Sequence, residues 1–300
     1  MRHSLGWLTR LTQPKDSARL VMSILCRNEV DIIEANIRTH AKLGVDAFVV
    51  MDNGSTDGTR ELLESLSREF DLTIIDQPEQ TYQQAKWMLQ LAHYARDKLG
   101  AQWVISNDAD EFWLPESGDI KSLLSMQDSV VTVARSNMIL DERALSDSYQ
   151  FTQARWRVNY PICYQKQAQL GDANLSMLLA PISPKVIVNP YGLIKLSGGN
   201  HRAKHWFKLV TKRDLPTLRV YHFPIRSWQQ FEQNIRQRER LLAQGARMGD
   251  HYRRWVACLK AGTLREEFEK LVIRDLELSV LARFGVVVED QRANLTLLAA

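Results

Sequence analysis

Two aspartates on either side of a small residue, Asp108-Ala109-Asp110, are the side chains of this sequence best placed to do chemistry. Carboxylate oxygens are the ligands that hard divalent cations such as Mg²⁺ and Mn²⁺ prefer. A cation held there could bridge to a diphosphate and neutralise charge as a leaving group departs. The triplet follows the apolar run 103–106. A solvated loop, or a helix cap before Glu111, is the competing interpretation.

A second polar cluster, DNGSTDGT at residues 52–59, also follows an apolar run, 47–51. Its Asp, Asn and Gly residues are typical of turns. Asp52 could accept a hydrogen bond from the N–H of a base ring. The alternative is a loop in which Thr56 or Asp57 caps the next helix.

The elements that would position these clusters alternate between strand and helix patterns. Strands are predicted at 19–25, 47–51, 72–75 and 103–106, and helices after Asn28, at 59–70 and at 82–99. Asn28 could cap the first helix, in which Ile33, Ile37 and His40 share a face. This alternation predicts βαβ units and a parallel sheet. Ligands bind at the carboxyl ends of such strands, so we expect CRNE, DNGSTD and NDADE to converge on one edge.

The rest of the chain has other patterns. Short β-like runs at 130–134, 149–158, 185–188 and 218–221 alternate with prolines, which predicts added strands and long loops where acceptor specificity would lie. From Ser227 to about residue 283 the pattern is helical, and the residues from Asp290 onwards look like a tail. Basic residues and aromatic side chains interleave over 226–260. They predict either contact with an anionic surface, which would be an acceptor glycan or the inner leaflet of a membrane, or a solvated helical face with an aromatic core stripe.

Composition and missing motifs exclude several classes. The net charge of +4 suits an anionic ligand or membrane surface without demanding nucleic acid. Three distant cysteines argue against zinc ribbons and disulfide frameworks and fit a reducing compartment. Signal-peptide and membrane-spanning patterns are missing. So are G-x-G-x-x-G, the P-loop, H-E-x-x-H and G-x-S-x-G, which leaves dinucleotide oxidoreductases, P-loop NTPases, zincins and serine hydrolases without support.

Taken together, the clusters resemble the motifs of family 2 glycosyltransferases, in the branch that reads KNE, DNGSTDGT and D-x-DEF. Here these motifs stand at 27–29, 52–59 and 108–112. The segment 222–227, HFPIRS, resembles the H-Y-P-x-R-S segment of that branch, and Gly199-Asn200-His201 resembles its upstream G-x-H element. Arg27 and Asn36 depart from the lysine and the aromatic residue that many relatives carry. Over about residues 18–240 the resemblance implies an α/β fold with a mostly parallel, Rossmann-like sheet of the nucleotide-diphospho-sugar transferase (glycosyltransferase A) type, followed by C-terminal helices.

The resemblance also implies roles at the nucleotide. Asp52 would contact the base, Asn53 and Asp57 would shape its pocket, and Arg27 and Glu29 would belong to the same nucleotide-sugar site.

A metal and the diphosphate have their own implied ligands. Asp110 would bind Mn²⁺ or Mg²⁺ and, through it, the diphosphate. Asp108 would hold the ribose or a metal-bound water and count as a metal ligand. His222 is a candidate for a further metal or diphosphate ligand, and Arg226 could pair with phosphate oxygens. We count Asp108 and Asp110 as catalytic.

The base that deprotonates the acceptor hydroxyl is not identified by any motif. We expect a carboxylate, with Asp172 as the choice and Asp141 and Glu142 as alternatives. Glu111 would rather support the metal loop.

These observations predict a metal-dependent glycosyltransferase that moves a sugar from a nucleotide-sugar, by resemblance a UDP-sugar, to a glycan or lipid-linked acceptor with inversion. We expect an arm at 1–17, a glycosyltransferase domain at 18–226 with halves at about 18–115 and 116–226, and a helical extension at 227–300. Surface polysaccharide assembly, in the cytoplasm and peripheral to the inner face of the membrane, would be the setting, without nucleic acid. The alternatives are a non-catalytic glycan- or nucleotide-binding relative and a nucleotidyltransferase of similar fold.

Overall fold

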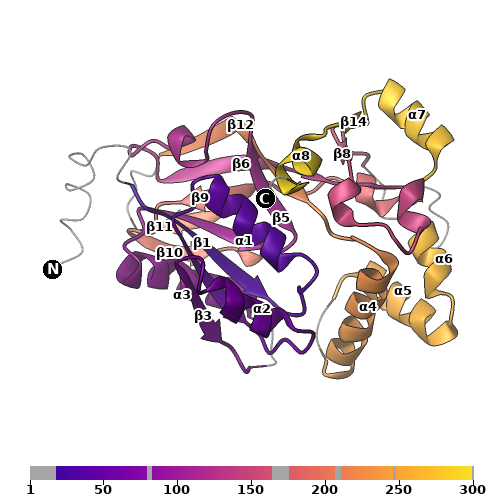
Figure 1. The fold of residues 1–300 in the computed structure, drawn as a ribbon, viewed down its shortest axis with the longest axis horizontal. Coiled ribbons are helices and arrows are strands. Elements are labelled where there is room, and N and C mark those ends of the chain that lie inside the picture. The colour runs from indigo at the N-terminus through magenta and orange to yellow at the C-terminus, as the bar shows by residue number, and fades with distance from the viewer. Residues whose placement is uncertain (1–17, 80–82, 164–175, 207–210, 246–247, 299–300) are drawn as a thin grey trace. The chain divides into compact units, whose positions relative to one another are not determined.

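The computed structural model describes residues 18–79, 83–163, 176–206, 211–245 and 248–298 (Figure 1). The predicted arm and Asp172 therefore lie outside the described residues. Contacts divide the chain into unit 1, residues 1–135 and 183–220, and unit 2, residues 136–182 and 221–299. The predicted boundaries at 115 and 226 stay predictions.

Unit 1 is built around an eight-stranded sheet with the order β3-β2-β1-β4-β9-β6-β12-β5. Strands β3, β2, β1 and β4 are parallel, whereas β9 is antiparallel to both β4 and β6. A small hairpin of β10 and β11 accompanies the sheet. The strands are β1 Leu20–Cys26, β2 Ala47–Asp52, β3 Leu72–Asp76, β4 Trp103–Asp108, β5 Glu111–Pro115, β6 Val130–Asn137, β9 Lys185–Val188, β10 Leu193–Leu196, β11 Ala203–His205 and β12 Lys212–His222.

The core of unit 1 forms because its central parallel strands, β1, β2 and β4, are largely buried on both faces. All of β2 and nearly all of β1 are buried, as expected for strands covered on both sides. One face, with Val21, Val49 and Val104, packs against Trp87 and Leu91 of helix α3. The helices are α1 Ile33–Lys42, α2 Thr59–Leu66 and α3 Gln84–Lys98. The predicted α/β class with a parallel sheet is confirmed.

One local prediction was wrong. Asn28 does not cap α1, whose N-cap is Ile32 and has no side-chain hydrogen bond. Asn28 instead adopts the left-handed region with φ of 58°, and its side-chain oxygen accepts from the backbone N–H of Thr56 at 2.8 Å. Asparagine tolerates this conformation better than most residues, so Asn28 joins two loops rather than starting a helix.

Unit 2 contains the predicted C-terminal helices around a second core. Phe231, Trp255 and Phe268 from three of these helices pack together in it. None of the described helices combines the length and the hydropathy needed to cross a bilayer. The elements are β7 Leu140–Asp141, β8 Trp156–Val158, β13 Val272–Ile273, β14 Val287–Glu289, α4 Trp228–Ala243, α5 Asp250–Ala261, α6 Leu264–Glu269, α7 Asp275–Arg283 and α8 Arg292–Leu298.

The predicted tail after Asp290 is also wrong. Strand β14 pairs with β8, and α8 follows it. The Asp290 carboxylate accepts from the guanidinium of Arg157 at 2.8 Å and from the hydroxyl of Tyr221 at 2.7 Å. Burial would raise the pKa of Asp290, but Arg292, Arg157 and Tyr221 outweigh it and hold that pKa well below its usual range. The end of the chain is therefore part of the folded unit.

Candidate functional site

The carboxyl ends of three neighbouring parallel strands bring the sequence motifs of unit 1 together. In the sheet register Asp52 of β2 lies opposite Cys26 of β1, and Asp108 of β4 lies opposite Leu25 on the other side of β1. Adjacent strands lie roughly 4.8 Å apart, so the backbones of Asp52 and Asp108, on either side of β1, lie roughly 10 Å apart. CRNE, DNGSTD and NDADE therefore share one edge, as predicted.

The loop after β2 is held by its own side chains. The buried carboxylate of Asp52 accepts from both the backbone N–H and the hydroxyl of Ser55. The amide of Asn53 donates to the carbonyls of Gln77 and Glu79, each at 2.8 Å, and so fixes the segment that follows β3. This fixes the loop before any ligand arrives.

Asp57 has a structural role within the same loop. Its carboxylate accepts from the backbone N–H and the hydroxyl of Thr59 at the start of α2 and from the backbone N–H of Val30. The N-cap of α2 is Gly58, so neither Thr56 nor Asp57 caps the helix, and Asp57 supports its first residue from outside the cap. Burial, and then the carboxylates of Asp52, Glu29 and Asp57, raise the pKa of the Cys26 thiol at the end of β1.

A buried lysine contacts the Asp108-Ala109-Asp110 triplet. The Nζ atom of Lys185, fully buried in β9, lies 2.6 Å from Oδ2 of Asp108 and 2.9 Å from Oε2 of Glu111. Glu111 is also fully buried and contacts Arg135 at 2.6 Å. Burial alone would lower the pKa of Lys185, but Glu111 and Asp108 outweigh it and raise that pKa. Asp108 is thus part of an alternating row of two carboxylates and two cations.

The second oxygen of Asp108 is engaged as well. Gln84 of α3 donates to Asp108 Oδ1 at 3.1 Å and accepts from the backbone N–H of Gly199 at 3.0 Å. Gln84 thereby connects Asp108 to the G-x-H element, residues 199–201. His201 in that element donates from Nδ1 to the carbonyl of Pro184 at 2.7 Å. Burial lowers the pKa of His201. The charge of Lys185 lowers it further, whereas the carboxylate of Asp108 acts in the opposite direction.

Gly199 is required by its surroundings. Its φ is +69°, and a Cβ atom there would lie 2.5 Å from Nε2 of His201. A larger residue would be strained and would also displace the imidazole. The glycine and the histidine of the G-x-H element are therefore coupled sterically.

A buried network of polar side chains holds the backbone around the Asp108-Ala109-Asp110 triplet. Asn36 of α1 donates to the carbonyls of Ala109 at 2.8 Å and Glu111 at 2.9 Å. Asn107 donates to the carbonyl of Glu111 and accepts from the indole N–H of Trp113. Asn36 and Asn107 are both fully buried. The departure at Asn36 from the aromatic residue of many relatives therefore positions the aspartate loop.

His40 completes this network in its neutral form. Its Nε2 accepts from the backbone N–H of Trp113 at 3.0 Å, and its Nδ1 donates to the carbonyl of Asn36 at 2.8 Å. A backbone amide can only donate, so Nε2 must be unprotonated. Burial lowers the pKa of His40 to about 4.

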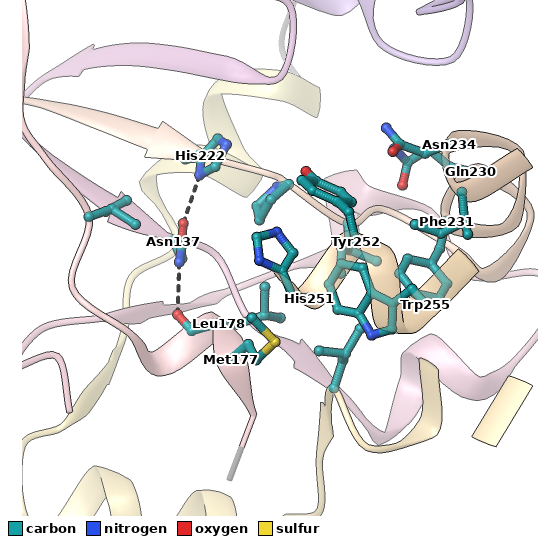
Figure 2. A pocket seen from close by; sticks show the side chains of 15 residues that line it. Asn137, Met177, Leu178, His222, Gln230, Phe231, Asn234, His251, Tyr252 and Trp255 are labelled. Carbon is teal, nitrogen blue, oxygen red and sulfur yellow. Dashed lines mark hydrogen bonds between the residues drawn. The ribbon is translucent and has the colours of Figure 1, made fainter. Parts of the chain in front are cut away.

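Two of the remaining predicted site residues belong to unit 2. Asn137 donates from Nδ2 to the carbonyl of Leu178 at 2.9 Å, so its oxygen faces His222 Nδ1 at 2.7 Å (Figure 2). The proton of the neutral imidazole of His222 is then on Nδ1, and Nε2 has the lone pair that binds a metal or a proton. Arg226 is 3% exposed, and its backbone N–H donates to Gln230 at 3.2 Å.

The predicted bases differ in their surroundings. Asp141 is buried and accepts from the guanidinium of Arg143 at 2.6 and 2.9 Å, and Glu142 lies 3.9 Å from Arg274. Asp172 lies outside the described residues, and the base stays a prediction.

Asp110 would supply one carboxylate to a divalent metal that is completed by ligand oxygens, and its role as a metal ligand stays a prediction. Within the described residues, His, Cys, Asp and Glu form no group of three or more able to hold a metal. Mg²⁺ is commonly bound by one or two carboxylates together with substrate phosphates and waters. Both oxygens of Asp108 contact side chains of the protein. Its role as a direct metal ligand stays a prediction, as does that of His222.

Comparison with known proteins assigns the class. Residues 23–170 match the family described as Glycosyl transferase family 2, which confirms the resemblance seen in the motifs. The matched residues are just under half of the chain, and the match supports sugar transfer from nucleotide-sugars in general. A search of curated proteins gives no match.

Similar solved structures include S. aureus TarS 1-349 in complex with UDP. That chain is 12% identical, with a TM-score of 0.42, and the match covers 84% of this chain and 72% of that one. Glucosyl-3-phosphoglycerate synthase from Mycobacterium tuberculosis in complex with phosphoglyceric acid is 19% identical, with a TM-score of 0.27, and the match covers 40% and 45%. At these TM-scores the likenesses add no weight to the assignment.

Several residues of the site were missed in the sequence. Lys185 opens an apolar strand, and a lone lysine in a buried run is a signal that a charged partner is needed. Arg135, Asn107 and Gln84 gave no such signal, because their partners lie far away in the sequence.

Proposed function

We propose that the chain transfers a sugar from a UDP-sugar to an acceptor hydroxyl with inversion, assisted by Mn²⁺ or Mg²⁺ at Asp110. The observation that carries the proposal is the placement of Asp52 and Asp108 on the two strands that flank β1. A nucleotide laid across these strand ends would have its base at Asp52 and its diphosphate at the aspartate triplet. Open parallel sheets bind ligands at this edge.

The residues of unit 1 have distinct tasks in this proposal. Asp52 accepts a hydrogen bond from the base. Lys185 and Gln84 fix the Asp108 carboxylate toward the ribose or a metal-bound water. A bound metal would supply neutralisation of the charge that develops on the departing diphosphate. Asn36 fixes the backbone on both sides of Asp110, so that the ligand finds the loop already in place.

The remaining predicted residues have roles in the same proposal. Arg27 and Glu29 would complete the nucleotide-sugar site, and Arg226 and His222 would bind phosphate oxygens or the metal. The acceptor would be a glycan or a lipid-linked sugar in surface polysaccharide assembly, on the cytoplasmic side of a membrane.

The test is the thermal stability of the protein with UDP, GDP, CDP and dTDP, each with and without Mn²⁺. A ligand at about 100 times its dissociation constant stabilises the folded state by about 2.7 kcal/mol. We expect a rise in melting temperature that needs both UDP and Mn²⁺ and is lost in Asp110→Asn. The matched control is Asp147→Asn, since Asp147 is exposed and lies outside the site.

The same measurement separates the alternatives. A shift with one of the other nucleotides would keep the reaction class and correct the donor. A larger shift with nucleoside triphosphates would favour a nucleotidyltransferase. If millimolar nucleotide and Mn²⁺ leave the melting temperature of the wild type unchanged, the donor-site proposal is refuted.

A further inference from the structure

A pocket of about 150 Å³ lies in unit 2 (Figure 2). A cavity of about this volume can admit a six-membered ring. Both main helices contribute with the same spacing, i, i+1 and i+4, which places three side chains on one helical face. They are Gln230, Phe231 and Asn234 of α4 and His251, Tyr252 and Trp255 of α5.

Aromatic rings form a fixed part of the wall. The Trp255 ring meets Phe231 at 5.0 Å between centroids and Tyr252 at 5.7 Å, each at an interplanar angle of 81°. The guanidinium of Arg238 lies over the Tyr252 ring at 4.7 Å. Edge-to-face and cation–π contacts of this kind hold rings in place. The aromatic residues interleaved with basic ones in the sequence thus line a pocket as well as a core.

Several polar groups on the wall are held by the protein. Gln230 accepts from the backbone N–H of Arg226, which orients its amide. Asn137 and His222 form the hydrogen-bonded pair described above, and Asn234 accepts from Arg238 at 3.4 Å. Among the described residues that line the pocket, none is acidic. The wall therefore suits an uncharged ligand with many hydroxyl groups better than a cation.

Trp255 adds an unsatisfied donor. Its side chain lines the pocket and is 6% exposed, and its indole N–H has no hydrogen-bond partner within the described part of the chain. Buried polar groups are nearly always paired, so each exception asks for a ligand or a water. This N–H is itself buried in the wall, so the ring of Trp255, and not its N–H, is what the pocket offers to a ligand.

We infer that this pocket binds a sugar ring of the acceptor glycan. A pyranose offers an apolar face of C–H groups to the aromatic rings and a rim of hydroxyls that both donate and accept, as the amides of Gln230 and Asn234 do. That the pocket binds a sugar is argued from the pocket alone. That this sugar belongs to the acceptor rests on the proposed function.

The test is saturation-transfer NMR of the full chain with methyl glycosides at tens of millimolar, namely neutral hexosides, N-acetylhexosaminides and hexuronides. We expect at least one class to bind. Asn234→Ala should weaken that binding about tenfold, the loss expected for a hydrogen bond in a pocket. Gln233→Ala is the matched control, because Gln233 is an exposed amide of the same helix outside the pocket.

Absence of saturation transfer to every glycoside, or equal binding by wild type and Asn234→Ala, overturns the inference. Every variant is also tested for the melting shift with UDP and Mn²⁺. A variant that keeps this shift and loses sugar binding supports the pocket. Sugar binding by a wild type that shows no shift with any nucleotide would uphold the pocket and refute the donor site.

Discussion

Lowering the pH from 6.5 to about 4 is expected to remove about 3 kcal/mol of folding free energy through one side chain, His40. The imidazole is fully buried, and its Nε2 must stay unprotonated to accept from the backbone N–H of Trp113. Its pKa is lowered from 6.5 to about 4 by burial. Each pH unit between these values corresponds to about 1.36 kcal/mol, which gives the magnitude.

The sign follows from which state binds the proton. Between pH 6.5 and about 4 the unfolded chain carries a protonated His40 and the folded chain does not. Stability therefore falls as the pH falls through this window, and it is unaffected by His40 above it. Because His40 contacts Asn36, and Asn36 holds the backbone of Ala109 and Glu111, the loss should loosen the aspartate loop.

Urea-induced unfolding followed by circular dichroism at a series of pH values measures this effect. His40→Gln keeps an acceptor for Trp113 and removes the titration. It should be less stable than the wild type at pH 7.5, by about 1–2 kcal/mol for the altered hydrogen bonds. Between pH 6.5 and 4 the wild type should lose about 3 kcal/mol more than the variant. Parallel curves for the two proteins over this window would refute the reasoning.

Two more perturbations test the charged groups. Lys185→Met leaves the carboxylates of Asp108 and Glu111 without their shared ammonium group. We expect the free energy of unfolding, measured in urea at pH 7, to fall by about 3–5 kcal/mol. A fall of less than about 1 kcal/mol would contradict a stabilising buried ion pair. Asp290→Asn removes the negative charge that Arg157, Arg292 and Tyr221 contact. The melting temperature of the variant should be several degrees below that of the wild type above pH 4, and the difference should shrink below pH 4, where the stabilising charge of the wild-type carboxylate is progressively lost. An unchanged melting temperature at pH 7 would show that these contacts do not hold the end of the chain.

The parallel strands could be predicted because their sequences are nearly continuous apolar runs. Such runs arise where both faces of a strand are buried, and they end where polar residues begin. The ends of β1, β2 and β4 were therefore visible, and with them the edge at which Asp52 and Asp108 meet. Topology added the rest, since consecutive βαβ units point their strands the same way.

The supports of the site could not be predicted in the same way. The helical spacing predicted His40 on the buried face of α1, but it could not predict the hydrogen bond with Trp113, which lies 73 residues away in the sequence. Lys185 contacts Asp108 across 77 residues, and β14 pairs with β8 more than a hundred residues earlier in the chain. Contacts of this kind depend on the assembled sheet, so a local pattern left them as a β-like run and a tail.

The aspartate triplet illustrates what the structure adds to a motif. Arg135, Glu111, Lys185 and Asp108 alternate in charge, so the row is neutral as a whole. A metal that bound Asp108 directly would have to displace an ammonium group at 2.6 Å that is already desolvated. The carbonyls of Ala109 and Glu111, on either side of Asp110, accept from Asn36, which fixes the backbone at that position. Lys185 and Gln84 position the carboxylate of Asp108, and we expect Asp110→Asn to abolish the metal-dependent binding of a nucleotide.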